Sequence, residues 1–219
     1  MVAVSLAATS AFGQGYVQFT TGKSQAYDGF TTAGASALST KVDVALFWAP
    51  SGTTPAVASL LTSTPTTGNS TTVEPYTAAQ AWTAILNGQF TLGQNGSSGN
   101  SSVIATTAAN GGLSYFGGSG FNLVGTASST AYSIYFVSWD STYATPAAAA
   151  AANGGAGAAV GWSQAFTYTT VNNLGQPSAM SSLTPGFGTF IPFAPTPEPA
   201  TLALAGLGGA SLLLFRRKK

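Results

Sequence analysis

The sequence predicts an all-β body, a β-sandwich of the jelly-roll or immunoglobulin-like kind, followed by a single C-terminal transmembrane helix. Three observations lead to this fold class. Short segments rich in Val, Ile, Thr, Tyr and Phe alternate with loops rich in Gly, Ser, Thr and Asn. Helix-forming stretches are few, and no period of about 20–50 residues repeats. One uncharged apolar run stands near the C-terminus and ends in basic residues.

The composition limits the function. The chain has 219 residues, with six Lys and Arg, five Asp and Glu, and a formal net charge of +1. Charged residues make up only 5% of the chain, against about 25% in an ordinary soluble domain. Four of the six cations are the last four residues, so the body has no basic patch, which argues against nucleic-acid binding. There is no Cys and no His, which removes disulfides, Ser-His-Asp and Cys-His catalysis and the usual zinc sites. We therefore expect no cofactor and no metal.

Residues 1–13 are predicted to be a signal peptide. The segment is apolar and small, and Ala11-Phe12-Gly13 has the small-x-small form of a signal-peptidase site. Cleavage there would make Gln14 the first mature residue. A positively charged n-region is missing, so we expect the natural start to lie upstream. The alternative is a buried first strand or helix.

The predicted β-sandwich body, residues 14–191, has three strong strand patterns. From Lys41 to Trp48 the side chains alternate, and one face carries Val42, Val44, Leu46 and Trp48. The segment from Ala131 to Trp139 is apolar on both faces, which indicates a central strand covered on both sides. The third strand is predicted from Val160 to Val171, with one face formed by Trp162, Gln164, Phe166 and Tyr168.

The remaining elements of the body have weaker patterns. Short strands are predicted at residues 16–20, 57–62, 89–92, 103–107, 112–116, 122–124 and 187–193. Residues 80–86 fit either a helix or a strand. Residues 94–102 are rich in Gly, Ser and Asn, which predicts a loop. Pro146 followed by Ala147–Ala152 favours one or two helical turns.

The C-terminus has three consecutive parts. Residues 192–199 form a Pro-rich linker that contains Pro197-Glu198-Pro199. Residues 200–219 form an apolar span followed by a basic membrane stop, which consists of Arg216, Arg217, Lys218 and Lys219. The span, 200–215, would make a helix of about 24 Å, shorter than the roughly 30 Å of a hydrocarbon core. A marginal span of this kind suits a processing signal better than a permanent anchor.

This order of tripeptide, apolar span and basic terminus resembles the PEP-CTERM sorting signal of secreted proteins in Gram-negative bacteria. The resemblance implies recognition by exosortase, a membrane-embedded protease that acts at or near the Pro-Glu-Pro. It implies a membrane-anchored precursor that is exported and then reaches the cell surface or the extracellular space. It also implies an association with exopolysaccharide. The alternative is an ordinary tail anchor with a chance Pro-Glu-Pro.

A second, internal pattern looks like one that recurs in small β-rich PEP-CTERM proteins. It comprises Val137-Ser138-Trp139-Asp140, then Tyr143 and an Ala run, then Gly161-Trp162-Ser163-Gln164-Ala165-Phe166. The bodies of such proteins mostly lack an assigned activity.

Few residues suggest catalysis. The run Gly161-Trp162-Ser163-Gln164-Ala165 approaches the nucleophile elbow Gly-x-Ser-x-Gly, but it lacks the last glycine and has no His to serve it. Asp140, beside Ser141 and Thr142, is either a weak Ca²⁺ ligand or a turn residue at a strand end. The carboxylates of the body are scattered singly: Asp28, Asp43, Glu74 and Asp140. No catalytic residue is predicted.

Four tryptophans are candidate sugar-stacking residues, if they lie on an exposed sheet face: Trp48, Trp82, Trp139 and Trp162. Aromatic residues in strands more often belong to the core. The sequence therefore predicts an exported cell-surface or extracellular-matrix protein without enzymatic activity. Two alternatives stay open, which are a carbohydrate-binding module for exopolysaccharide and a glycoside hydrolase that uses carboxylates alone.

Overall fold

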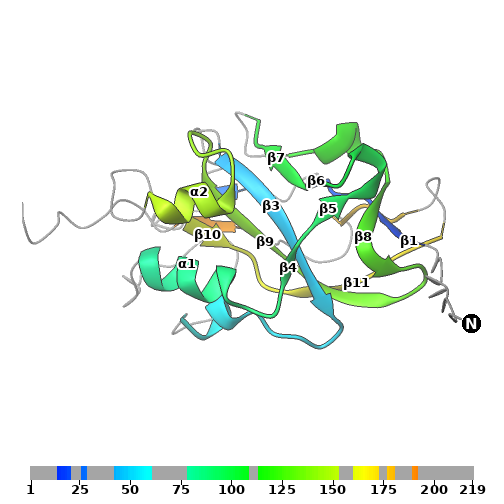
Figure 1. Cartoon of the computed structure of the whole chain (residues 1–219), viewed down its shortest axis with the longest axis horizontal. Helices are drawn as coiled ribbons and strands as arrows, with labels where there is room; N and C mark the ends of the chain where they lie inside the picture. The colour runs from blue at the N-terminus through cyan, green and yellow to red at the C-terminus, as the bar shows by residue number, and fades with distance from the viewer. Residues whose placement is uncertain are drawn as a thin grey trace, which may run out of the picture.

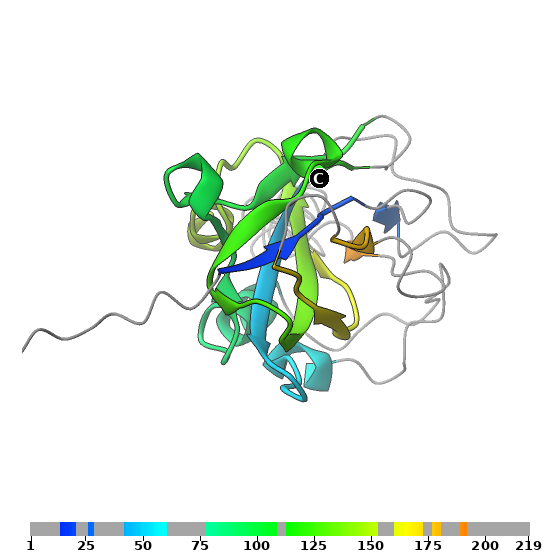
Figure 2. The ribbon, with the colours of Figure 1, turned by 90° about the vertical axis from the view of Figure 1, so that its right-hand side faces the viewer.

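A computed structural model describes residues 14–20, 26–28, 42–60, 78–108, 113–152, 160–172, 177–180 and 189–191. The described part is mostly β-strand, which confirms the predicted all-β body (Figure 1). It is built as three layers, in which a small sheet and a group of helices cover the two faces of a large sheet. In Figure 2 the small sheet lies in front of the large one. The predicted signal peptide, linker and C-terminal span lie outside the described residues.

The large sheet has the strand order β2-β12-β10-β9-β3-β4, and β11 and β7 pair with β9 and β3 off this path. Its strands are β2 (Ala26–Asp28), β3 (Val42–Pro50), β4 (Thr91–Leu92), β7 (Ile104–Thr106), β9 (Ala131–Asp140), β10 (Val160–Trp162), β11 (Phe166–Thr169) and β12 (Thr189–Ile191). The two long strands, β3 and β9, form its centre and pair antiparallel over their length. Only β2 and β12 run parallel to each other among the described strand pairs.

The small sheet has the order β1-β8-β5-β6, and all its pairs are antiparallel. Its strands are β1 (Gln14–Val17), β5 (Gln94–Asn95), β6 (Ser101–Ser102) and β8 (Phe121–Ala127). Val17 lies opposite Phe121, so the first strand pairs with one that follows about a hundred residues later.

Residues 94–102, predicted to be a loop, form a hairpin that interrupts the edge strand of the large sheet. The Gly93 N–H donates to the carbonyl of Leu46 over 2.8 Å, and the Leu46 N–H donates to the carbonyl of Val103 over 3.2 Å. Both ends of the hairpin therefore meet at one residue of β3. The 3₁₀ turn η2 (Gly96–Ser98) joins β5 to β6, and these two strands extend the small sheet. A Cβ on Gly93 would lie 2.8 Å from Leu46 Cδ2, so this crossing requires glycine.

Apolar side chains form a core on each face of the large sheet. Between the two sheets lie residues of β1, β3, β8, β9 and β11, among them Val17, Val44, Leu46, Phe121, Leu123, Ile134, Phe136 and Tyr168. The opposite face packs on α1 (Ala78–Leu86), α2 (Pro146–Ala151) and the 3₁₀ helix η1 (Ala56–Leu60), through residues that include Phe47, Val57, Trp82, Ile85, Tyr135, Val137, Trp139, Ala149 and Trp162. We call these the inter-sheet core and the helix-side core. β9 is covered on both faces, as predicted.

The predicted continuous strand from Val160 to Val171 is wrong. Trp162 lies opposite Val137 and Phe166 lies opposite Ile134, so this segment advances four residues while β9 advances three. Such a one-residue bulge reverses the alternation of side chains. Trp162 packs in the helix-side core, while Tyr168 packs in the inter-sheet core with Phe166 against it. The common face predicted for Trp162, Gln164, Phe166 and Tyr168 therefore does not form.

Ser163 holds this bulge against β9. Its backbone N–H donates to the carbonyl of Phe136 over 2.9 Å. Its Oγ accepts from the Phe136 N–H, also over 2.9 Å. One residue thus satisfies both main-chain groups of its neighbour on β9.

The shorter elements agree with the prediction in most places. The helical alternative holds for residues 80–86, which lie in α1. α2 starts after Thr145, whose Oγ1 accepts from the Ala148 N–H over 3.1 Å, with Pro146 in the first turn. Two predicted strands are wrong. Residues 56–60 form η1, which packs Val57 in the helix-side core. Residues 115–118 form the 3₁₀ helix η3 (Tyr115–Gly118), which follows a single β-bridge between Ser114 and Thr20.

Candidate functional site

Three of the four candidate sugar-stacking tryptophans meet in the helix-side core. Trp82 of α1, Trp139 of β9 and Trp162 of β10 are 2%, 0% and 4% exposed. The rings of Trp82 and Trp139 lie 6.4 Å apart at 65°, and the Trp139 Nε1 donates to the carbonyl of Tyr143 over 2.6 Å. These rings present no face to solvent, so Trp82, Trp139 and Trp162 do not form the expected platform. They belong to the core, as aromatic residues in strands more often do.

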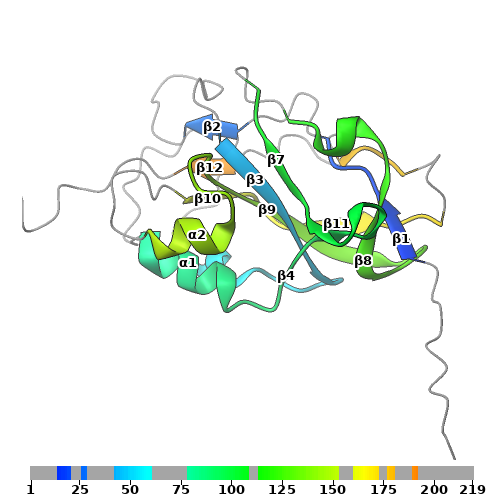
Figure 3. The same ribbon diagram turned by 45° about the horizontal axis from the view of Figure 1, so that its top comes forward.

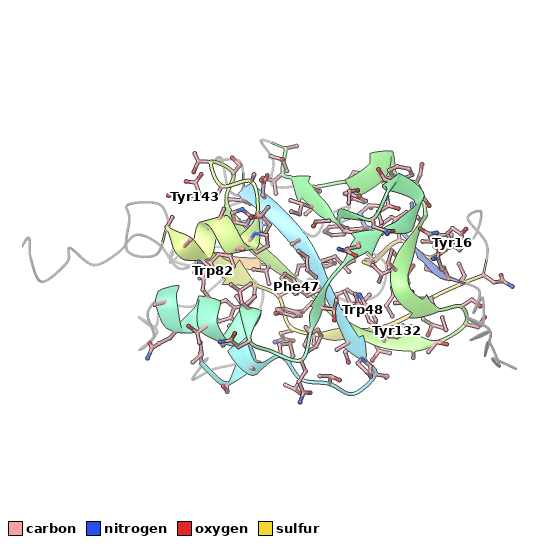
Figure 4. All side chains as sticks on the ribbon, in the orientation of Figure 1. Tyr16, Phe47, Trp48, Trp82, Tyr132 and Tyr143 are labelled. Atoms are coloured by element: carbon pink, nitrogen blue, oxygen red, sulfur yellow. The ribbon has the colours of Figure 1, made fainter. Side chains whose placement is uncertain are left out.

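Trp48 is partly buried and packs against the inter-sheet core. Its ring meets Tyr132 edge-on, with centroids 5.3 Å apart and planes at 87° (Figure 4). A sugar-stacking surface needs aromatic rings that lie in one plane. Trp48 and Tyr132 are perpendicular and therefore do not make one.

The internal pattern from Val137 to Phe166 is a packing unit. β10 lies beside the end of β9, with Val160 opposite Trp139 and Trp162 opposite Val137. Ala149 of α2 fills the same core. The two Trp-containing ends of the pattern are therefore neighbours across one strand pair, and the Ala run between them contributes Ala149 to the same core.

Ser163 has no features of a nucleophile. Its side chain is buried, and its Oγ accepts from the Phe136 N–H and donates to the carbonyl of Gln164 over 3.0 Å. Both hydrogen bonds go to main-chain groups, and the chain contains no His that could activate the hydroxyl.

The two carboxylates with described side chains do not form a pair. In the register of β3 and β9, Asp43 lies opposite Trp139 and Asp140 lies opposite Val42. Neighbouring residues of a strand point to opposite faces, so Asp43 and Asp140 lie on opposite faces of the sheet. A glycoside hydrolase needs two carboxylates that flank one bond. Within the described ranges, no group of three or more His, Cys, Asp or Glu is placed to hold a metal ion.

Each of these carboxylates has a structural role. Asp43 is buried, and its Oδ1 accepts from the Thr106 Oγ1 over 2.6 Å, which ties β3 to β7. The Oδ1 of Asp140 accepts from the Thr142 N–H over 2.9 Å, and its carbonyl accepts from the Tyr143 N–H over 3.1 Å. Asp140 is therefore the turn residue at a strand end that the sequence offered as an alternative to a Ca²⁺ ligand.

A polar network that sequence reasoning missed lies on the small sheet. Asn122 of β8 donates through Nδ2 to Gln14 Oε1 and accepts from Ser97 Oγ over 3.2 Å. Asn95 accepts from the Ser97 N–H over 2.9 Å and donates to the Tyr115 hydroxyl over 3.3 Å. The network consists of uncharged groups and joins β1 to residues 95–122, about 80 or more residues later in the chain, so no local signal could have found it.

The comparison with known families identifies a motif in the C-terminal tail, outside the predicted body. The PEP-CTERM protein-sorting motif matches residues 195–218, which include Pro197, Glu198, Pro199 and the apolar span. No curated protein and no solved structure matches the chain. The chain thus carries the sorting signal of an exported protein, and the resemblance seen in the sequence is confirmed.

The motif implies export, processing by exosortase and a membrane-anchored precursor. The matched residues lie outside the described ranges. Within those ranges, none of the helices has the length and apolar character needed to cross a bilayer.

Proposed function

We propose that this chain is a non-enzymatic protein of the cell surface or extracellular matrix, released by exosortase from a membrane-anchored precursor. The observation that carries the proposal is the sorting motif at residues 195–218. The body supports it because the side chains of Ser163, Asp43 and Asp140 have structural roles. Each forms a hydrogen bond within a neighbouring strand pair or turn.

The chemistry of the tail suits a processing signal. Pro197 and Pro199 fix φ near −65° and lack N–H donors, which keeps the tripeptide out of a helix. A protease that binds its substrate in extended form would find this segment ready at the bilayer edge. The basic terminus, residues 216–219, stays on the cytoplasmic side, because Lys and Arg are retained there.

The two alternative functions have no specific support among the described residues. Asp43 and Asp140 face opposite sides of the sheet, which removes them as a hydrolytic pair. A carbohydrate-binding face would need several exposed coplanar rings, whereas three of the tryptophans are buried and Phe116, 47% exposed, is the single exposed large aromatic side chain within these ranges.

The test is a pair of substitutions in the native host. Pro197→Ala with Glu198→Ala removes the tripeptide and leaves the span and basic end intact. The control is Pro192→Ala with Pro195→Ala, which changes the same linker outside the tripeptide. By mass spectrometry, wild type and control are expected to end near Pro199. The variant is expected to keep Lys219 and stay in the membrane fraction. Retention of Lys219 in wild type would make the tail an ordinary anchor. Trimming of the variant would show that processing does not depend on the tripeptide.

A further inference from the structure

The direction of β12 determines where the chain leaves the body. β12 pairs antiparallel with β10, where Phe190 lies opposite Trp162, and β10 pairs antiparallel with β9. β12 therefore runs in the same direction as β9 and ends where β9 ends and β3 begins. β2 is parallel to β12, with Asp28 opposite Ile191, and ends there too. We call this the exit end, defined by Asp28, Val42, Asp140 and Ile191. Figure 3 shows β2, β12 and α2 on one side of the molecule and β1 and β8 on the other.

The chain between the exit end and the predicted membrane span is short. Ile191 closes β12, and the apolar span starts at Ala200. Nine Cα–Cα steps reach at most about 30 Å when fully extended, and a Pro-rich linker stays close to that length, at about 3.1 Å per residue. The large sheet is itself about 30 Å long along β9, at about 3.3 Å per residue. The tether is therefore no longer than the sheet it holds.

The charges of the described body are also collected at the exit end. The described ranges contain three carboxylates and no Lys or Arg. Asp28 and Asp140 are the last residues of β2 and β9, and Asp43 is the second residue of β3. Anionic lipid headgroups attract Lys and Arg, and neither occurs among the described residues of this surface.

We propose that, in the membrane-anchored precursor, the body stands with its exit end toward the lipid headgroups, held there by the tether alone. The inference rests on the proposed function, because it requires residues 200–215 to be in the bilayer. β9 and β3 then run away from the membrane, and the turns at their far ends are the most distant part of the sheet. Trimming at the tripeptide separates the tether from the membrane span and releases the body without residual lipid binding.

The test uses the absence of cysteine from the natural chain. Ser141→Cys and Ser51→Cys each place one thiol on an exposed turn, the first after β9 at the exit end and the second after β3 at the far end. Each full-length precursor is labelled with a fluorophore and reconstituted in phosphatidylcholine vesicles with a minor share of nitroxide-headgroup lipid. Quenching is expected to be at least about twofold stronger at position 141 than at position 51, since the two ends are about 30 Å apart.

A lengthened tether is the matched control. A flexible Gly-Ser segment of about 100 residues inserted between Phe193 and Ala194 gives an average reach of about 55 Å, nearly twice the sheet length, so the two labels should be quenched equally. In the original chain, equal quenching or stronger quenching at position 51, in protein that floats with the vesicles, would overturn the orientation. Protein that does not float would instead overturn the membrane-anchored precursor.

A second arm tests whether the tether alone holds the body. A protease site in place of residues 192–195 allows the linker to be cut in the reconstituted precursor. The released body is expected to leave the floating vesicles completely. If it stays with them, its own surface binds lipid and this part of the proposal is wrong.

Discussion

At the scale of single residues, Gly125 shows how closely the two sheets approach each other. Gly125 lies in β8 with a φ of +83°, and a Cβ added there would lie 3.0 Å from Trp48 Cζ2 of β3. Trp48 is held from another direction by the edge of Tyr132 (Figure 4). The indole has little room to move aside, so both the backbone conformation and the space favour glycine.

Gly125→Ala is expected to lower the free energy of unfolding by about 2–4 kcal/mol, which combines backbone strain with overpacking against Trp48. The control is Gly52→Ala, because Gly52 has a φ of +85° and nothing within 4 Å of its added Cβ. That change should cost only the backbone strain, about 1–2 kcal/mol. Urea unfolding followed by tryptophan fluorescence measures both. Equal losses would mean that Trp48 moves aside freely.

At the scale of elements, the break between β10 and β11 decides which core each aromatic residue enters. Ser163 supplies a side-chain acceptor to Phe136 where the regular ladder is interrupted. In an unbroken strand Trp162 and Phe166, four residues apart, would point to the same face of the sheet. With it, the segment contributes to both the helix-side core and the inter-sheet core.

Ser163→Ala is expected to lower the free energy of unfolding by about 1–3 kcal/mol, because the buried Phe136 N–H loses its acceptor. Ser138→Ala is the control on the same sheet. The Ser138 Oγ is equally buried and has no hydrogen-bond partner among the described residues, so its removal breaks no hydrogen bond and should leave stability unchanged or raise it by about 1 kcal/mol. Both values come from urea denaturation at neutral pH. A neutral Ser163→Ala would show that the bulge does not depend on the hydroxyl.

Elements with a local signal could be predicted from the sequence, and those defined by distant partners could not. β3, β9 and α2 have their own alternation or capping pattern, and the sorting tail is one contiguous signal. The hairpin β5–β6 has two-residue strands, of which β5 joins the small sheet by pairing with β8 at Asn95. The bulge at Ser163 has no mark in the sequence pattern from Val160 to Val171 and shows only in the register against β9. The burial of Trp82 depends on α1, a segment that fitted helix and strand equally.

At the scale of the whole molecule, buried tyrosines link stability to alkaline pH. Burial raises the pKa of Tyr135 above its usual range. Burial also raises the pKa of Tyr168 to about 12, although the N–H of Gln18 that bonds its hydroxyl opposes the shift. In the unfolded chain a tyrosine ionises near pH 10. The neutral phenols therefore stabilise the fold fully below about pH 10, and this contribution is lost as the pH rises toward 12.

The body, residues 14–194, expressed without leader and tail, is expected to lose stability between pH 8 and pH 11. The loss should be about 1 kcal/mol for each buried tyrosine. Tyr135→Phe removes one titrating group, so its loss over the same range should be smaller by about 1 kcal/mol. Urea midpoints at the two pH values measure this difference. Identical pH dependence of variant and parent would show that Tyr135 ionises as readily in the fold as in the unfolded chain.

The pairing of β1 with β8 has a consequence for the order in which the chain is made. A ribosome adds roughly 5–20 residues per second, so β1 waits on the order of 5–20 s before its partner strand exists. During that interval β1 is a nascent strand without a sheet. In this strand Gln14 and Tyr16 alternate with Gly15 and Val17, so Val17 is its one aliphatic side chain, which gives it too little apolar surface to seed aggregation on its own. β1 can therefore remain unpaired until β8 has been synthesised.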